Sequence, residues 1–205
     1  METLVDQAVT TTLRGGGGEM VRLYVAACAE RMAPLFVGLR AGGAGREGDV
    51  DFYVESVRDL WRVDRPPSDA PERVRVLERF PELHPMDDEA VTDVVGINTF
   101  FAALVLRYAL LANGSGSADD AVSCGHAALT AMGMLDQNVF GASFRAQEHG
   151  LQSLSASGDA AGLWEASIEA GRERFRAVLG RTTDNSGRGH TTSASVPPVL
   201  QRYIR

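Results

Sequence analysis

The side chains that most often carry metal or acid–base chemistry are few in this chain and widely spaced. The four histidines are His84, His126, His149 and His190. None has the Glu-x-x-His or His-x-x-x-His spacing that puts ligands on one face of a helix, as di-iron and zinc sites require. Cys124 precedes one of these histidines by two positions, so the two side chains would point in different directions from a helix. We therefore expect no metal ion and no cofactor.

Motifs for phosphate binding and nucleophilic catalysis are also missing from the sequence. The glycine runs 15–18 and 42–45 have no strand before them and no lysine after them, as a P-loop would need. Residues 114–116 are Gly-Ser-Gly rather than part of Gly-x-Ser-x-Gly, and they are typical of a linker. The sequence favours a protein without enzymatic activity. Catalysis without a cofactor leaves little trace in a sequence, so an enzyme stays open as an alternative.

Two polar residues interrupt the most apolar segment of the chain, residues 88–113. A buried amide without a partner costs about 1–3 kcal/mol, so we expect Asn98 to make a structural hydrogen bond across a bundle. For Arg107 we expect an ion pair, with Glu148 as one candidate partner. The alternative is a small molecule held between helices. The residues expected to line such a site are Tyr24, Trp61, Asn98, Phe101, Arg107 and Trp164.

The charges argue against a nucleic-acid partner. All twenty basic residues are arginines, and the formal net charge is -7. The only basic cluster, Arg172, Arg174 and Arg176, alternates with Glu169 and Glu173, which is typical of a solvated face and not of a basic stripe. We expect no nucleic-acid binding, and an acidic surface of this kind suits a basic protein partner. A transcriptional regulator would need a basic helix-turn-helix within the first fifty residues, and the glycines 15–18 together with Pro34 make that segment a poor candidate.

The sequence shows no targeting segment that we can identify. The N-terminal residues include two early acids and no apolar run, unlike a secretory signal. The apolar stretch 97–112 is shorter than a membrane span and is interrupted by Asn98 and Arg107. We therefore expect a cytoplasmic protein without membrane contact.

Apolar periodicity predicts an all-α fold. Residues 88–113 form the longest periodic segment and are apolar around most of a helical circumference, which favours the centre of a bundle. The spacing predicts further helices over residues 19–40, 49–61, 71–80, 117–136, 143–155 and 159–180. We expect a single-domain bundle of about six to seven helices around the central helix 88–113.

The ends of the chain differ in composition from the bundle. Residues 1–18 end in four glycines, which predicts a flexible N-terminal arm before a bundle domain over residues 19–180. Residues 181–205 are expected to be a disordered linker with a short docking segment at 196–205. Its apolar residues would dock on the same bundle or on a second copy, so a homodimer is one expected assembly.

Three stretches together resemble a known family. Residues 28–36, Cys-Ala-Glu-Arg-Met-Ala-Pro-Leu-Phe, are similar to a kinked first-helix motif, and Leu60-Trp61 to the end of a second helix. Residues 108–111, Tyr-Ala-Leu-Leu, with the small-residue helix after them, resemble a central helix pair. The family is number 416 among the bacterial domains of unknown function, with its actinobacterial relatives, and the resemblance covers residues 19–179. It implies a compact helical domain and no established chemistry, hence no catalytic residues.

These observations support one leading function and one main alternative. The leading hypothesis is a non-enzymatic, helical protein-binding module. An immunity-type partner that neutralises a toxin is one form of it, because some neighbouring helical families serve as immunity proteins. The alternative is a small-molecule-binding protein or cofactor-independent enzyme with its site between helices.

Overall fold

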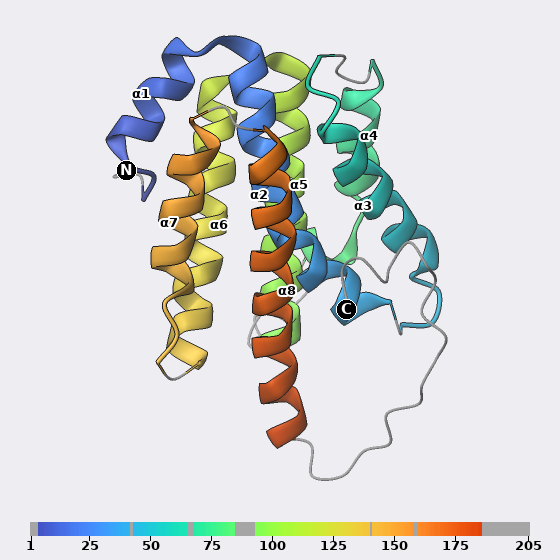
Figure 1. The fold of residues 1–205 in the computed structure, drawn as a ribbon. Coiled ribbons are helices and arrows are strands. Elements are labelled where there is room, and N and C mark those ends of the chain that lie inside the picture. Colours follow the sequence, from blue (N-terminus) through green and yellow to red (C-terminus); the bar gives the residue numbers. More distant parts are fainter. Residues whose placement is uncertain are drawn as a thin grey trace.

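The computed structural model describes residues 4–41, 43–64, 68–84, 93–139, 141–157 and 160–185. Within these residues the protein consists of helices and contains no strand, which confirms the all-α prediction. The elements are α1 (Gln7–Gly15), α2 (Gly17–Arg40), α3 (Glu47–Leu60), α4 (Ala70–Leu77), the 3-10 helix η1 (Pro81–Leu83), α5 (Val94–Ser115), α6 (Ala118–Asn138), α7 (Phe144–Ser155) and α8 (Ala160–Asn185). They pack as one bundle (Figure 1).

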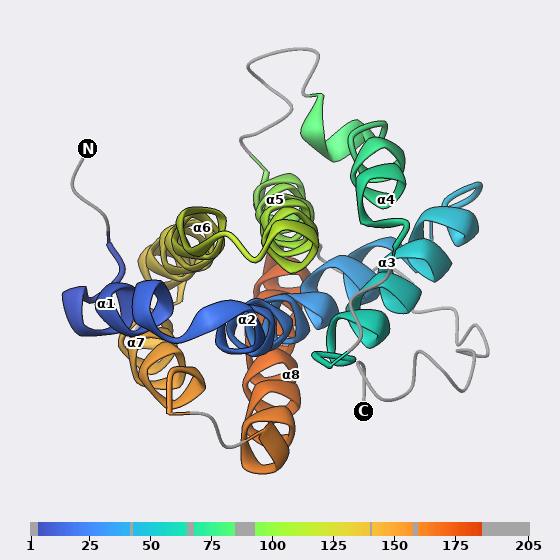
Figure 2. The ribbon, with the colours of Figure 1, turned by 90° about the horizontal axis from the view of Figure 1, so that it is seen from above.

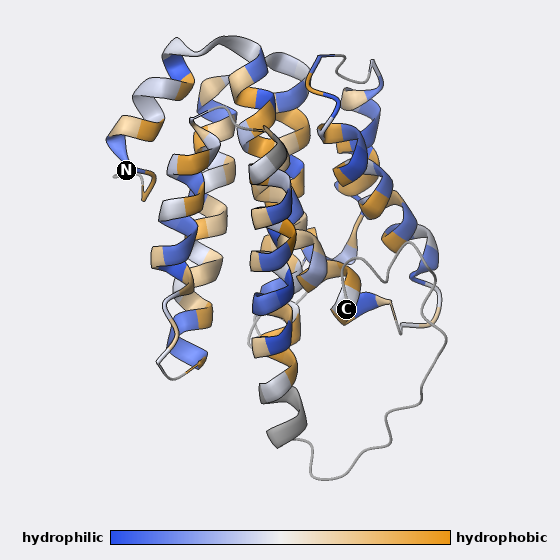
Figure 3. Cartoon of the chain, viewed as in Figure 1, coloured by the Kyte–Doolittle hydropathy of each residue, from blue (hydrophilic) through white to orange (hydrophobic). Residues whose placement is uncertain are grey.

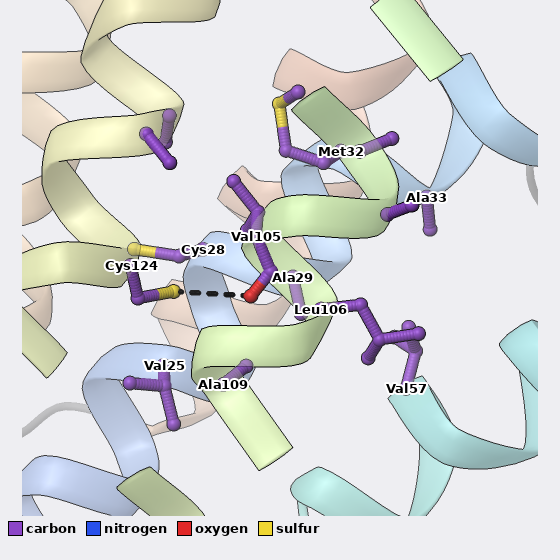
Figure 4. Close-up of a cluster of buried hydrophobic side chains, with 14 of the residues drawn as sticks. Val25, Cys28, Ala29, Met32, Ala33, Val57, Val105, Leu106, Ala109 and Cys124 are labelled. Atoms are coloured by element: carbon purple, nitrogen blue, oxygen red, sulfur yellow. Dashed lines mark hydrogen bonds between the residues drawn. The ribbon is translucent and has the colours of Figure 1, made fainter. Parts of the chain in front are cut away.

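Helix α2 lies at the centre of this bundle. Every residue from Leu23 to Val37 is buried, and the helix packs between α5 and α8 (Figure 2). Small side chains on α2, such as Ala29 and Ala33, let neighbouring helices approach closely (Figure 4). The apolar segment predicted to be central is therefore a neighbour of α2, and the central position belongs to α2.

Helix α5 covers most of the predicted segment 88–113 and continues to Ser115. It begins after Asp93, whose carboxylate accepts a hydrogen bond from the Gly96 amide, and ends before Gly116, which adopts a left-handed φ of 70°. Residues 88–92 lie outside the described residues. Among the described helices, α5 is long and apolar enough to cross a membrane, a property that the core helix of a soluble protein shares. It packs against α2 and α6, as a bundle helix does.

Aromatic and aliphatic side chains fill the core between α2, α3 and α5. Phe36 stacks on Tyr53 with ring centroids 4.4 Å apart, and it also stacks with Phe80 at 5.7 Å. Between α5 and α6, the Cys124 thiol donates to the Val105 carbonyl (Figure 4). The core therefore continues from the α3 side of α2 to the α6 side.

The N-terminal segment is a packed helix and not a flexible arm. Val5, Val9 and Leu13 are buried, and the Leu4 amide donates to Nδ1 of His126 on α6. The glycine run forms a turn between α1 and α2, in which Gly17 has a φ of 73°. The arm prediction was wrong because glycine content was taken as a sign of mobility, whereas here it allows a tight turn.

Helix α8 packs along α2 at positions where glycine is required. An added Cβ on Gly171 would lie 2.8 Å from Pro34 Cγ and 2.9 Å from the Arg31 carbonyl oxygen, and one on Gly38 would overlap the Phe175 ring. Many hydrophilic residues lie on the face of α8 turned toward the viewer in Figure 3. The helix continues to Asn185, beyond the predicted bundle boundary at 180. The docking segment predicted at 196–205 lies outside the described residues.

Candidate functional site

The six residues predicted to line a small-molecule site occupy different surroundings. Tyr24 is fully buried, and its hydroxyl donates to Gln152 Oε1 at 2.8 Å. Trp61 is partly buried and donates through Nε1 to Glu30 at 2.9 Å. Trp164 is 40% exposed.

The other three lie along α5. Asn98 is buried, and its amide donates to the Val94 carbonyl of its own helix at 2.7 Å rather than across the bundle. Phe101 is partly buried and meets the neighbouring Phe100 ring edge-on at 5.1 Å. Arg107 donates to Glu78 of the α4 region at 2.7 Å, and not to Glu148. None of the six lines the hollow between α4 and α5 that is described below.

Three fully buried charged side chains meet where α2, α7 and α8 pack together. Arg31 of α2 donates two hydrogen bonds to Glu148 of α7, at 2.9 Å from Nε and 2.7 Å from Nη2. Both side chains are fully buried. Arg174 of α8, also fully buried, donates to the same carboxylate at 2.8 Å. We call these three residues the buried ion cluster.

Hydrogen bonds extend the buried ion cluster toward α6. Gln152, one turn after Glu148 on α7, donates to that carboxylate at 3.0 Å and to the Gly125 carbonyl at 3.0 Å. Its amide oxygen accepts from Tyr24. A Cβ on Gly125 would overlap the Tyr24 hydroxyl and lie 3.0 Å from Gln152 Oε1, so glycine is needed there for these side chains to meet.

The surroundings fix the protonation states of these groups. Burial alone would raise the pKa of Glu148, but the guanidinium groups of Arg31 and Arg174 outweigh burial and lower it to about 2. Burial is the main reason that the pKa of Tyr24 lies well above its usual value. At neutral pH the carboxyl group stays ionised and the phenol stays protonated. The cluster is therefore poorly suited to acid–base catalysis, which needs a group that exchanges protons near the working pH.

Arg174 and Arg31 were missed by sequence reasoning for different reasons. Arg174 was assigned to a solvated face because acids surround it in sequence, yet it lies three residues after the buried Gly171 and four before the buried Val178. Residues three and four apart lie on the same face of a helix, so this spacing indicates that Arg174 faces inward. Arg31 lies inside the apolar run of α2. Burial of either arginine requires the acid Glu148, which is far away in sequence.

A second candidate feature is the outward face of α5. Six apolar residues at three-and-four spacing are only partly buried, and they define what we call the α5 outer face. They are Ile97, Phe100, Phe101, Leu104, Tyr108 and Leu111. The face spans about 21 Å at 1.5 Å per residue. Helices α2, α4 and α6 contact α5, and the six side chains stay partly exposed.

A hollow of about 660 Å³ adjoins the C-terminal end of the α5 outer face. Leu111 belongs to both, and the walls of the hollow come from the start of α4 and the end of α5. The lining residues are Ser68, Ala70, Pro71, Val74, Arg75, Leu110, Leu111, Gly114 and Ser115. Most of them are apolar or small, so the hollow suits an apolar group with polar contacts at its edge.

Comparisons with known proteins identify no relative of this chain. The chain matches no family model, no curated protein and no solved structure. The resemblance to the helical family stays a prediction.

Proposed function

We propose that this chain is a protein-binding module that receives an apolar helix of a partner protein along the α5 outer face. The observation that carries the proposal is the stripe of six partly exposed apolar side chains. Contiguous apolar surface of this kind marks interaction sites in soluble proteins. Its length of about 21 Å corresponds to about four turns of a bound helix.

The geometry is that of helix-in-groove recognition. Helices α4 and α6 both contact α5 and lie on opposite sides of it (Figure 2), and an amphipathic helix binds such a surface through anchors at three-and-four spacing. The hollow beyond Leu111 is large enough for one bulky anchor side chain. The net charge of -7 favours a partner whose apolar face is bordered by basic residues.

The finer form of the proposal is an immunity-type protein in the cytoplasm that binds a toxin encoded beside it. Support for this form is the resemblance of residues 28–36 and 108–111 to the bacterial helical family, together with the acidic charge. The partner is then a basic protein, and binding needs no chemical step from this chain.

The test co-expresses the tagged full chain with each protein encoded by the adjacent genes and measures the affinity of the complex that forms. Leu104→Glu places a charge at the middle of the α5 outer face and should weaken binding at least 100-fold. Leu154→Glu is the matched control, because Leu154 is 39% exposed on α7. It should leave the affinity within a factor of three.

Three results would contradict the proposal. One is equal affinity of the two variants for the partner. The second is flotation of the wild-type chain with lipid vesicles that depends on Leu104, which would make α5 a membrane-contact face. The third is a stable homodimer that Leu104→Glu dissociates while no adjacent gene product binds, which would assign the face to a second copy.

The hollow favours one second candidate, the binding of a small apolar molecule. Its volume of about 660 Å³ lies in the range of ligand sites. Gly114→Leu would fill part of this space from the α5 side, since an added Cβ meets the Ala70 side chain at 3.0 Å. A ligand retained from expression should be lost from this variant and kept in Leu104→Glu; a protein-only function predicts no such ligand in either.

A further inference from the structure

The buried ion cluster carries one uncompensated positive charge. Arg31 and Arg174 are both fully buried, and Glu148 is the acid that contacts them among the described residues. The nearest further acid on α8, Glu173, is exposed and accepts a hydrogen bond from Gln147 at 2.8 Å. A net charge in a protein interior is costly unless a counter-charge accompanies it.

Hydrogen bonding in the cluster is equally unbalanced. Oε1 of Glu148 accepts from Arg31 Nη2 and Gln152, and Oε2 accepts from Arg31 Nε and Arg174 Nη2. Four donors occupy the acceptor positions that a carboxylate offers. Nε and Nη1 of Arg174 are buried and have no acceptor among the described residues.

Two polar neighbours of Arg31 do not correct this imbalance. The Cys28 sulfur accepts from Arg31 Nη2 at 3.2 Å, and the Ser167 hydroxyl lies 3.4 Å from Arg31 Nη1, so both meet Arg31 and not the unpaired atoms of Arg174. Burial lowers the pKa of Arg174, and Arg31 lowers it further, against the opposing effect of Glu148. A bound water would accept hydrogen bonds but would leave the charge in place.

We propose that the interface of α2, α7 and α8 binds one small monovalent inorganic anion, of the size of chloride, against the Arg174 guanidinium. The anion accepts from Nε–H or Nη1–H and balances the buried charge. The enclosure of Arg174 restricts the ligand to this size. Gln147 is half-buried and links Arg174 Nη2 to the exposed Glu173, so its side chain is the one expected to move for exchange.

The test follows thermal unfolding while chloride replaces gluconate at constant ionic strength. Above its Kd, chloride should raise the Tm of the wild type by about 4 °C for each tenfold increase in concentration, because it binds the folded state alone. Arg174→Met should lose this response. Arg176→Met removes the same charge two residues away, at a side chain that is 54% exposed, and should keep it.

Equal chloride responses in the two variants, or none in the wild type, would overturn the proposal. A measurement on the wild type alone covers the case in which Arg174→Met does not fold. Crystals grown in bromide should show an anomalous peak within hydrogen-bonding distance of Arg174 Nε or Nη1. A water molecule at that position and no bromide would equally overturn it.

Discussion

Glu148 holds two arginines in the protein interior, so its ionisation is coupled to folding. Its pKa in the folded protein is about 2, against an ordinary value of 4.5. The folded protein therefore holds this proton less tightly than the unfolded chain does. The ionised Glu148 carboxylate therefore contributes roughly 3 kcal/mol to the free energy of unfolding. This contribution is complete above about pH 4.5 and is lost as the pH falls toward 2. Urea unfolding at successive pH values measures this loss.

Two comparisons assign the pH effect to Glu148. Glu82, whose pKa the Arg46 guanidinium lowers against the effect of burial, adds a loss of the same sign, so Glu148→Gln should reduce the pH dependence without removing it. This variant should also be less stable at pH 7 by about 3–5 kcal/mol, since it leaves two buried cations unpaired. An NMR titration of the wild-type carboxyl group that gives a pKa near 4.5 would contradict the assignment.

The same residues show what sequence can reveal at this scale. The inner face of α7 includes the polar residues Glu148 and Gln152, and its buried residues follow the same three-and-four spacing as those of an apolar face. Hydrophobicity alone would instead place Leu151 and Leu154 on the inner face, yet Leu154 is 39% exposed. A buried polar side chain is recognisable from sequence only when its partner is known, and here the partners lie on α2 and α8.

At the scale of elements, glycines set how closely α8 can approach α2. We expect Gly171→Ala to destabilise the protein by about 1–3 kcal/mol, because the methyl group would press on Pro34 and the Arg31 carbonyl. Gly180→Ala is the control on the same helix. An added Cβ there meets nothing within 4 Å, so it should be neutral or stabilising by up to about 1 kcal/mol. Similar Tm values for both variants would show that α8 has room to shift.

The packed α1 makes a second prediction at this scale. Leu13 is 1% exposed, so Leu13→Ala should lower the free energy of unfolding by about 2–4 kcal/mol. Thr11→Ala, on the exposed side of the same helix, should change it by less than about 0.5 kcal/mol. A mobile arm would make both substitutions neutral, which denaturant titration would reveal.

Most helices could be predicted from their apolar spacing, but their neighbours could not. Periodicity and capping residues located α3, α6 and α8 to within a few residues at most ends. An α-helix with apolar residues on all sides is equally consistent with a central helix and with one that offers a face to a partner. Residues 88–113 were assigned the first role, whereas Phe100 and Leu104 are partly exposed, as the proposed second role requires.

For the whole molecule, the two sides of α5 should respond differently to substitution. Phe100 is partly exposed, and Phe100→Ser should change the free energy of unfolding by less than about 1 kcal/mol while it reduces the binding of an apolar dye to the native protein. Leu106 is fully buried, and Leu106→Ala should cost about 2–5 kcal/mol. Comparable costs for both would mean that the outer face is part of the core.

The buried ion cluster also affects the order in which this protein can fold during synthesis. Arg31 is separated by 117 positions from Glu148 and by 136 from Ser167. Helix α2 therefore leaves the ribosome early, but its interior surroundings are complete only after α8 has been made. Until then a nascent chain exposes an apolar helix that contains an unpaired cation. Truncated chains that end before α8 should consequently be preferred substrates of chaperones and proteases. The full-length chain should become resistant to proteolysis in one late step.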